Sequence, residues 1–276
     1  MTSTTPSNNS NTEAYQATQY LLRRRIPPSL YYKLRNFSRQ YPILFLPLAR
    51  WRWSRWRKQY NITISGPEPA APDPVTRDTA VVIEGFPRMG NTFAHIAFKM
   101  AQPEPVKIGH HTHAAAQVVA AAKMDIPTLV LIREPEAAIV SYLIGDFDPS
   151  LGIGQSLKEY ISFYKAILPY REKVIVAKFD DVTSDYGSVI NALNDRFNTN
   201  FEKFDHTEEN VNRCFELIEE GYQYAFGAVS EKVVCRPSKL RKAMKQDIQA
   251  QFYSEAFSKL RQQAETIYKT LIQANT

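Results

Sequence analysis

Residues Gly85 to Thr92, GFPRMGNT, have the composition of an anion-binding turn. The apolar run Ala80–Ile83 precedes the turn, and its β-branched residues without alternation predict a strand buried on both faces of a parallel sheet. The segment Thr92–Met100 after the turn predicts a helix. Backbone N–H groups at such a helix start, together with the helix dipole, attract phosphate. An ordinary tight turn has the same glycine spacing, so the turn alone does not define the site.

The turn differs from the loop that binds nucleoside triphosphates. That loop reads GxxxxGK[ST], with a Lys that reaches the phosphates and a Ser or Thr that binds magnesium. Here Asn91 stands at the Lys position, and the basic residue is Arg88, two positions before Gly90. An Arg inside the loop can stabilise charge on a leaving phosphate without a metal ion. The sequence therefore favours a metal-free anion site over ATP hydrolysis.

A second basic residue lies where the same site would need it. Pro127–Ile132 predicts another buried strand, and Arg133 follows it. Ser141 comes eight residues later, on the second turn of the predicted next helix. Open α/β sheets bind ligands at the carboxyl ends of their strands. We therefore expect Arg133 and Ser141 to face the same anion as Arg88.

These segments resemble the sulfotransferases that use 3′-phosphoadenosine 5′-phosphosulfate (PAPS). EGFPRMGNTF is similar to their 5′-phosphosulfate loop, and LVLIREPEAAIVSY to their 3′-phosphate segment. VIVAKFDDVTSDYGSVINAL resembles a later strand, acidic turn and helix, so the likeness covers roughly residues 79–193. It implies a P-loop-type α/β fold with three layers, in which helices flank a central parallel sheet. It also implies metal-free in-line transfer from PAPS to a hydroxyl or amine, leaving adenosine 3′,5′-bisphosphate (PAP).

The resemblance implies a role for particular residues. Arg88 would contact the 5′-phosphate and the bridging oxygen, and Arg133 and Ser141 would hold the 3′-phosphate. The remaining residues at cofactor-binding positions are Met89, Gly90, Asn91, Thr92, Phe93 and, near the C-terminus, Arg236. Met89, Asn91 and Phe93 replace the usual Ser, Thr and Trp, which leaves more of the binding to backbone N–H groups. Phe179 takes a position that often lies near the adenine, although a core position explains it equally well.

Histidines between the two motifs are candidate bases. Val106–His113 contains His110, His111 and His113, and Thr112–His113 matches the end of a Lys-Thr-His segment that supplies the base in many sulfotransferases. Neutral imidazole suits proton removal near pH 7. We predict His113 as the base, with His111 as the alternative. Zinc is a weaker reading, because His111 and His113 would lie on one side of a strand but the sequence shows no third ligand.

The composition divides the chain into four parts. We predict a disordered polar tail over 1–14, a basic aromatic-rich appendage over 15–62, a proline-rich linker over 63–78 and the sulfotransferase-like domain over 79–276. Residues 15–60 contain eleven Lys and Arg and no acid, so a chain of net charge +6 leaves −5 for the rest. No signal peptide is evident at the N-terminus, and Cys214 and Cys235 are the only two cysteines. A cytoplasmic protein is therefore expected.

The appendage has the composition of an interfacial membrane anchor. All three tryptophans lie in it, beside the apolar run Tyr41–Ala49, which two prolines interrupt and which is too short to span a bilayer. An anionic membrane surface is therefore a candidate partner. Packing on the domain, with a solvated basic face, explains the composition as well. No signature of a nucleic-acid-binding fold accompanies the charge.

Further along the chain, helices are predicted over 156–170, 185–197, 208–226 and 251–272, and a strand over 173–179. Asp180 and Asp181 are expected to cap the helix over 185–197. Two other functions stay open: a P-loop kinase acting on a small molecule, and a non-catalytic adaptor that keeps the nucleotide fold. The acceptor could be a small molecule, a lipid or a glycan.

Overall fold

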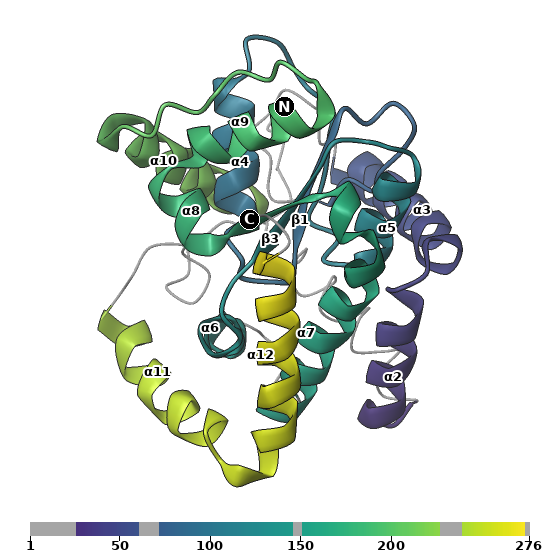
Figure 1. Ribbon diagram of the computed structural model, residues 1–276, viewed down its shortest axis with the longest axis vertical. Coiled ribbons are helices and arrows are strands. Elements are labelled where there is room, and N and C mark those ends of the chain that lie inside the picture. The colour runs from purple at the N-terminus through teal and green to yellow at the C-terminus, as the bar shows by residue number, and fades with distance from the viewer. Residues whose placement is uncertain (1–25, 61–71, 146–150, 227–238, 274–276) are drawn as a thin grey trace, which may run out of the picture.

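The computed structural model describes residues 26–60, 72–145, 151–226 and 239–273. Seventeen elements follow one another along these ranges (Figure 1). They are α2 (Pro28–Ser38), α3 (Pro42–Tyr60), β1 (Val81–Gly85), α4 (Asn91–Ala101), β2 (Ile108–His110), α5 (Ala115–Lys123), β3 (Thr128–Ile132), α6 (Pro135–Gly145), α7 (Ile153–Ile167), η1 (Leu168–Lys173), β4 (Ile175–Lys178), α8 (Phe179–Ser184), α9 (Tyr186–Phe197), α10 (Glu208–Phe226), α11 (Lys239–Phe252), η2 (Glu255–Phe257) and α12 (Ser258–Gln273).

The centre of the fold is a parallel sheet of four strands in the order β2-β1-β3-β4. Every residue of β1 and β3 is buried, as the uninterrupted apolar runs in the sequence predict. The chain moves from β1 to β2 on one side and then returns to β3 on the other side of β1. Crossovers between parallel strands are right-handed, so this reversal places helices on both faces of the sheet.

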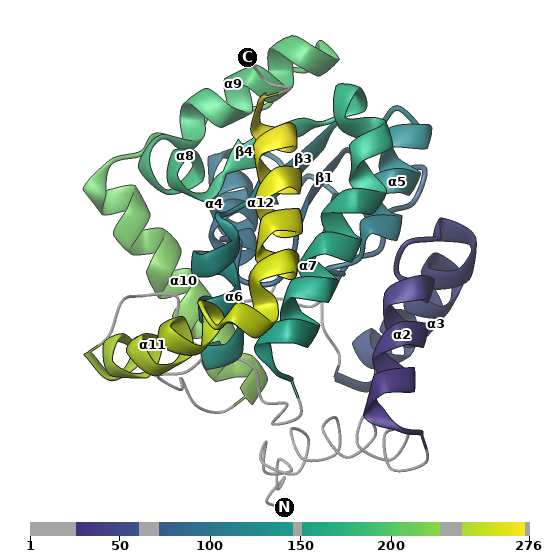
Figure 2. The ribbon, with the colours of Figure 1, turned by 60° about the horizontal axis from the view of Figure 1, so that its bottom comes forward.

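The helices form two layers around the sheet, which confirms the predicted α/β class. On one face, α4 packs on β1 and β2, α9 on β4, and α10 on α4. On the other face, α5 packs on β1 and β3, α12 on β4, and α7 between α5 and α12. Figure 2 shows α5, α7 and α12 side by side in front of the strands. The carboxyl ends of β1 and β3 therefore lie at the reversal point, where open α/β sheets bind ligands.

The two N-terminal helices pack against this body. Helix α2 contacts α7, and α3 contacts α5. Arg35 pairs with the buried carboxylate of Glu159 at 3.2 Å, and Arg39 donates to the carbonyl of Thr112 at 3.1 Å. Leu46, on α3, is buried in a small apolar cluster between this helix and the domain. One face of the basic segment is thus part of the folded domain, while the predicted domain boundaries themselves stay predictions.

Two sequence-based expectations are wrong in detail. Asp180 and Asp181 lie inside the short helix α8, and Asp185 is the residue that caps α9, accepting from the N–H of Ser188. The helix expected over 251–272 is interrupted near its start: residues 251–252 end α11 and α12 begins at Ser258, with α11 packed on α6 and α12 packed mainly on α7. Arg261 closes the break by donating to the carbonyls of Phe252 and Ser254.

Other expectations fall partly or wholly outside the described residues, namely the tail over 1–14 and most of the linker over 63–78. Within the linker range, the backbone of Asp73 bridges to that of His110 beside β2. Among the described helices, none is both long and apolar enough to cross a membrane.

Candidate functional site

The turn after β1 has the backbone of an anion-binding loop. Gly85 has no room for a side chain, because a Cβ there would lie 2.7 Å from the carbonyl oxygen of Leu131. Gly90 has a φ of 85°, in the left-handed region that glycine adopts without strain. Arg88 also has a positive φ, 70°, which is uncommon for a residue with a side chain. The loop therefore bends sharply twice before α4 begins at Asn91.

The start of α4 directs backbone donors at this loop. The first N–H groups of a helix have no acceptor inside the helix, so those following Gly90 are available to an anion. The Asn91 side chain donates to the carbonyl of Phe86 at 2.9 Å and braces the loop from inside. Met89 and Phe93 have their side chains in the core, so only their backbones can contribute to a ligand.

Arg88 and Ser141, two of the predicted site residues, lie next to each other. Arg88 Nε lies 3.4 Å from Ser141 Oγ, which brings the loop and α6 into contact. The Arg88 guanidinium also lies against Gly145, where a Cβ would come 3.2 Å from its Cζ. A basic side chain of the loop after β1 and a hydroxyl of α6 thus meet at one point.

Arg133 is linked to Gly90 through the ring of Phe179. Its Cζ is 3.8 Å from the centroid of the Phe179 ring, a close cation–π contact. A Cβ on Gly90 would touch the same ring at 3.3 Å. Phe179 is half-buried and lies between the loop and Arg133. The carboxyl ends of β1, β3 and β4 therefore all contribute residues to the same edge of the sheet.

Glu84, the fourth residue of β1, is a buried carboxylate that sequence reasoning missed. It accepts five hydrogen bonds of 2.8–3.2 Å. The donors are the N–H groups of Gly85, Thr112 and His113, the Thr112 hydroxyl and the Gln117 amide. Burial raises the pKa of Glu84 to about 7. Because the donors come from the loops after both β1 and β2, Glu84 fastens these two loops together.

His113 presents one ring nitrogen to the site. Its Nδ1 lies 2.9 Å from the carbonyl oxygen of Gly85, and a carbonyl can only accept, so Nδ1 carries the proton. The lone pair of the neutral ring is then on Nε2. About a quarter of the side chain is exposed. Burial, reinforced by the charges of Arg39, Arg35 and Arg88, lowers the pKa of His113 to about 4.

His111 is held differently. Its Nε2 lies 3.1 Å from the Thr92 hydroxyl, and its Nδ1 lies 2.7 Å from Nδ1 of His110. Both ring nitrogens are therefore engaged within the protein. The expectation that His111 and His113 share one side of a strand is wrong. β2 ends at His110, and both residues follow it with positive φ values of 55° and 48°.

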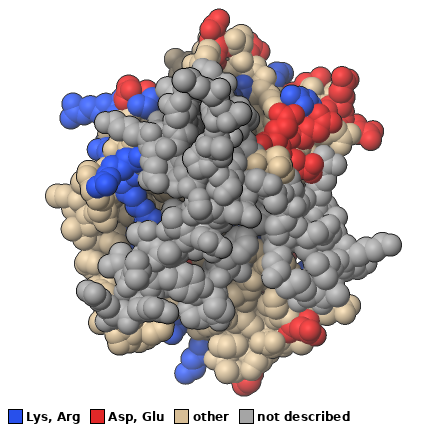
Figure 3. Space-filling view, turned by 180° about the vertical axis from the view of Figure 1, so that it is seen from behind, with Lys and Arg blue, Asp and Glu red and all other residues tan. Residues whose placement is uncertain are grey.

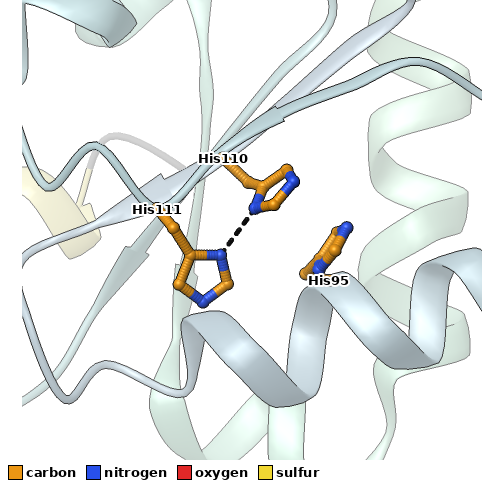
Figure 4. Close-up of side chains that lie close together, drawn as sticks. All are labelled: His95, His110 and His111. Atoms are coloured by element: carbon orange, nitrogen blue, oxygen red, sulfur yellow. Dashed lines mark hydrogen bonds between the residues drawn. The ribbon is translucent and has the colours of Figure 1, made fainter. Parts of the chain in front are cut away.

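His95 of α4 completes a cluster of three buried histidines with His110 and His111 (Figure 4). The sequence did not reveal this third member, because it is fifteen residues away and meets β2 only through the packing of α4. The candidate ligand atoms lie within 4.8 Å of one another. The rings of His95 and His110, however, stack at 3.7 Å and 18°, so their in-plane lone pairs do not converge on one point.

The hydrogen bond between His110 and His111 also disfavours zinc. Two nitrogens bound to one tetrahedral zinc ion at 2.0–2.1 Å lie about 3.3 Å apart. The two Nδ1 atoms are 2.7 Å apart, which fits a shared proton. We therefore describe this cluster as a hydrogen-bonded stack, which supports Thr92 through the contact of its hydroxyl with His111.

Other predicted contacts are not placed at this edge. Arg236, which the resemblance places among the cofactor-binding residues, lies outside the described residues. A shallow hollow between α7 and α12, lined by residues including Lys158, Ile161 and Leu260, lies away from the strand ends.

Comparison with known proteins gives only distant likeness of fold. No protein-family model matches the chain. No curated protein sequence matches it either. Among solved structures, a crystal structure of mouse sulfotransferase SULT7A1 complexed with PAP aligns with 74% of this chain and 90% of its own, at 9% identity and a TM-score of 0.37. Statements about this site therefore depend on its own residues.

The buried imidazoles predict loss of stability in acid. Burial lowers the pKa of His113 to about 4, that of His95 to about 3, and that of His111 well below 6.5. As the pH falls below 6.5, the unfolded chain gains three protons that the folded chain does not bind. Glu84 has the opposite effect on stability, by one proton, because its raised pKa makes the folded state bind that proton at a higher pH than the unfolded state does. The free energy of unfolding should fall by about 1.4 kcal/mol per pH unit for each net proton.

Urea unfolding between pH 7 and pH 5 measures this slope. His111→Asn, which tolerates the positive φ, should reduce the slope by about one proton. A stability that rises on acidification, or a slope unchanged in the variant, would contradict the assignment.

Proposed function

We propose that the chain is a sulfotransferase that moves the sulfuryl group of PAPS to a hydroxyl or amine without a metal ion. The observation that supports it most is the position of His113. A neutral imidazole with its lone pair on Nε2 is fastened to the same strand end that bears the anion-binding loop and Arg88. The resemblance of the two loop sequences to those of PAPS-dependent enzymes supports the same reaction.

The residues of the edge suit the phosphate groups of such a donor. The N–H groups at the start of α4 and Arg88 would hold the 5′-phosphate. Arg133, with Ser141, would hold the 3′-phosphate, and the exposed part of the Phe179 ring offers a surface for a base to stack on. The donor supplies an activated sulfuryl group whose leaving group is a phosphate.

The reaction would then proceed by in-line displacement. His113 Nε2 accepts the proton of the acceptor hydroxyl while the acceptor oxygen bonds to sulfur. The bond from sulfur to the 5′-phosphate oxygen breaks, and its electron pair stays on that oxygen. Arg88 and the helix N–H groups stabilise the charge gained there. Because the pKa of His113 lies well below 7, the imidazole is already neutral at neutral pH.

Among the residues that the structure describes, the same edge lacks features that a magnesium-dependent kinase uses. Asn91 occupies the position of the phosphate-binding Lys, and its side chain is committed to the loop. Residue 133 after β3 is Arg where a magnesium-binding Asp is usual. Glu84, the carboxylate that directly precedes Gly85, already accepts five hydrogen bonds.

Calorimetric titration with PAP in EDTA tests donor binding. We expect binding without metal, and we expect Arg133→Ala to weaken it by roughly ten- to a hundredfold, the worth of a charged hydrogen bond. Arg171→Ala is the matched control, because Arg171 is exposed and precedes β4 at the opposite end of the strand. No binding of PAP, or preference for ATP with magnesium, would contradict the proposal and favour the kinase.

Replacing His113 by Asn tests the base. Asn keeps a donor for the Gly85 carbonyl and tolerates a positive φ, but it has no Nε2. Turnover with ³⁵S-labelled PAPS and a panel of hydroxyl and amine acceptors should fall by about 10²–10⁴-fold, while the affinity for PAP stays unchanged. Retained turnover in His113→Asn, with loss in His111→Asn, would transfer the role to His111.

A further inference from the structure

The apolar side chains that the folded chain leaves exposed are concentrated on two helices. In the described part of the chain, ten large hydrophobic residues are exposed, and eight of them lie on α2, on α3 or between them. The eight are Leu30, Leu34, Phe37, Tyr41, Ile43, Leu44, Leu48 and Trp51, and the other two are Met124 and Tyr253. Contiguous apolar patches of this kind mark interaction sites.

Helical spacing places these side chains on the outer faces. On α2, and at its end, they recur at 30, 34, 37 and 41, and on α3 at 44, 48 and 51, which is the i, i+4, i+7 pattern of one stripe. The inner faces are already used: Tyr32, Leu46 and Ala49 are buried. The alternative interpretation, in which the apolar run Tyr41–Ala49 packs on the domain, therefore holds only for the inner side of α3. Ile43 is 82% exposed and Leu48 62% exposed.

The charge beside the apolar stripes has one sign. Lys33, Arg52 and Arg55 are exposed, and the sequence from Tyr15 to Tyr60 contains no acid. Arg55 lies over the Trp51 ring at 5.1 Å, and Arg52 lies 5.9 Å from the Trp53 ring. Figure 2 shows α2 and α3 together at one side of the molecule. In the back view of Figure 3, Lys and Arg gather at one side, and a group consisting mainly of acids lies at the opposite side.

We propose that the outer face of α2 and α3 docks on an anionic phospholipid bilayer. Leucine, phenylalanine and tryptophan side chains would enter the boundary between headgroups and acyl chains, while the arginines pair with anionic headgroups. The helices lie along the surface and do not cross it, since neither is long and apolar enough to span. The positive face complements anionic lipid, whereas the apolar stripes distinguish a bilayer from a purely ionic partner such as a nucleic acid. This proposal is independent of the reaction proposed above.

Tryptophan fluorescence gives a direct reading of docking. All three tryptophans, Trp51, Trp53 and Trp56, lie in α3, so the emission of the full chain reports on this helix alone. With vesicles of phosphatidylcholine and phosphatidylserine we expect a blue shift of emission and co-sedimentation of the protein. Vesicles of phosphatidylcholine alone should bind more weakly, and added salt should weaken binding to the anionic vesicles.

Variants on the outer face test the contact while keeping the reporters. Phe37→Gln/Leu44→Gln/Leu48→Gln should lower the partition coefficient by roughly tenfold or more, because three apolar side chains no longer enter the bilayer. Met124→Gln is the matched control, since Met124 is also exposed but lies at the end of α5. Arg52→Gln/Arg55→Gln should reduce binding to anionic vesicles, and Arg196→Gln/Lys203→Gln, two exposed cations elsewhere, should not.

Three results would overturn the proposal. The first is a chain that stays in solution with both kinds of vesicle and shows no shift of tryptophan emission. The second is vesicle binding that the apolar triple variant retains while its circular dichroism and melting temperature match those of the unaltered protein. The third is a dimer in light scattering that the triple variant converts to a monomer without any binding to vesicles, which would assign the face to a contact between copies.

Discussion

The candidate site depends on the burial of one carboxylate, Glu84, at the end of β1. An ionised or polar group inside a protein is tolerated only when hydrogen bonds replace its water, and this carboxylate has five. Its donors are Gly85 at the end of β1, Thr112 and His113 in the connection between β2 and α5, and Gln117 on α5. Two loops that are more than twenty residues apart in the sequence are therefore held as one unit. Loss of this group would leave several buried donors without an acceptor, which costs about 1–3 kcal/mol for each.

The rigidity of this unit explains the unusual backbone around it. Five non-glycine residues of the described chain have a positive φ. Three of them, Arg88, His111 and His113, lie in the two loops that Glu84 joins. Such conformations cost energy and persist where the surroundings determine them. These conformations position two candidate site residues: Arg88 points toward Ser141, and His113 is held with Nδ1 on the Gly85 carbonyl. Burial and nearby arginines then keep the imidazole neutral.

Local patterns in the sequence predict the strands and the turn after β1 well, and they single out Arg88, Arg133 and Ser141 as candidate site residues. Each of these is signalled by neighbours in the chain: an apolar run, a glycine spacing, a basic residue after a strand. Glu84 and His95 carry no such signal, because Glu84 reads as an ordinary strand end and His95 as one residue of an amphipathic helix. Their partners are set by the packing of α4 on β2 and of one loop on another. The break between α11 and α12 escapes prediction for the same reason, since the apolar spacing continues through it while the packing partner changes.

The central claim is that the two loops hold His113 neutral, with its lone pair on Nε2, beside the anion-binding loop. Nitrogen NMR of ¹⁵N-histidine-labelled protein tests it directly, with the His113 signal identified by its absence in His113→Asn. We predict a neutral Nδ1-protonated ring that resists protonation down to about pH 4, and a shift of its Nε2 signal when PAP is added. A His113 signal that titrates near its ordinary value of 6.5 and ignores PAP would contradict the account.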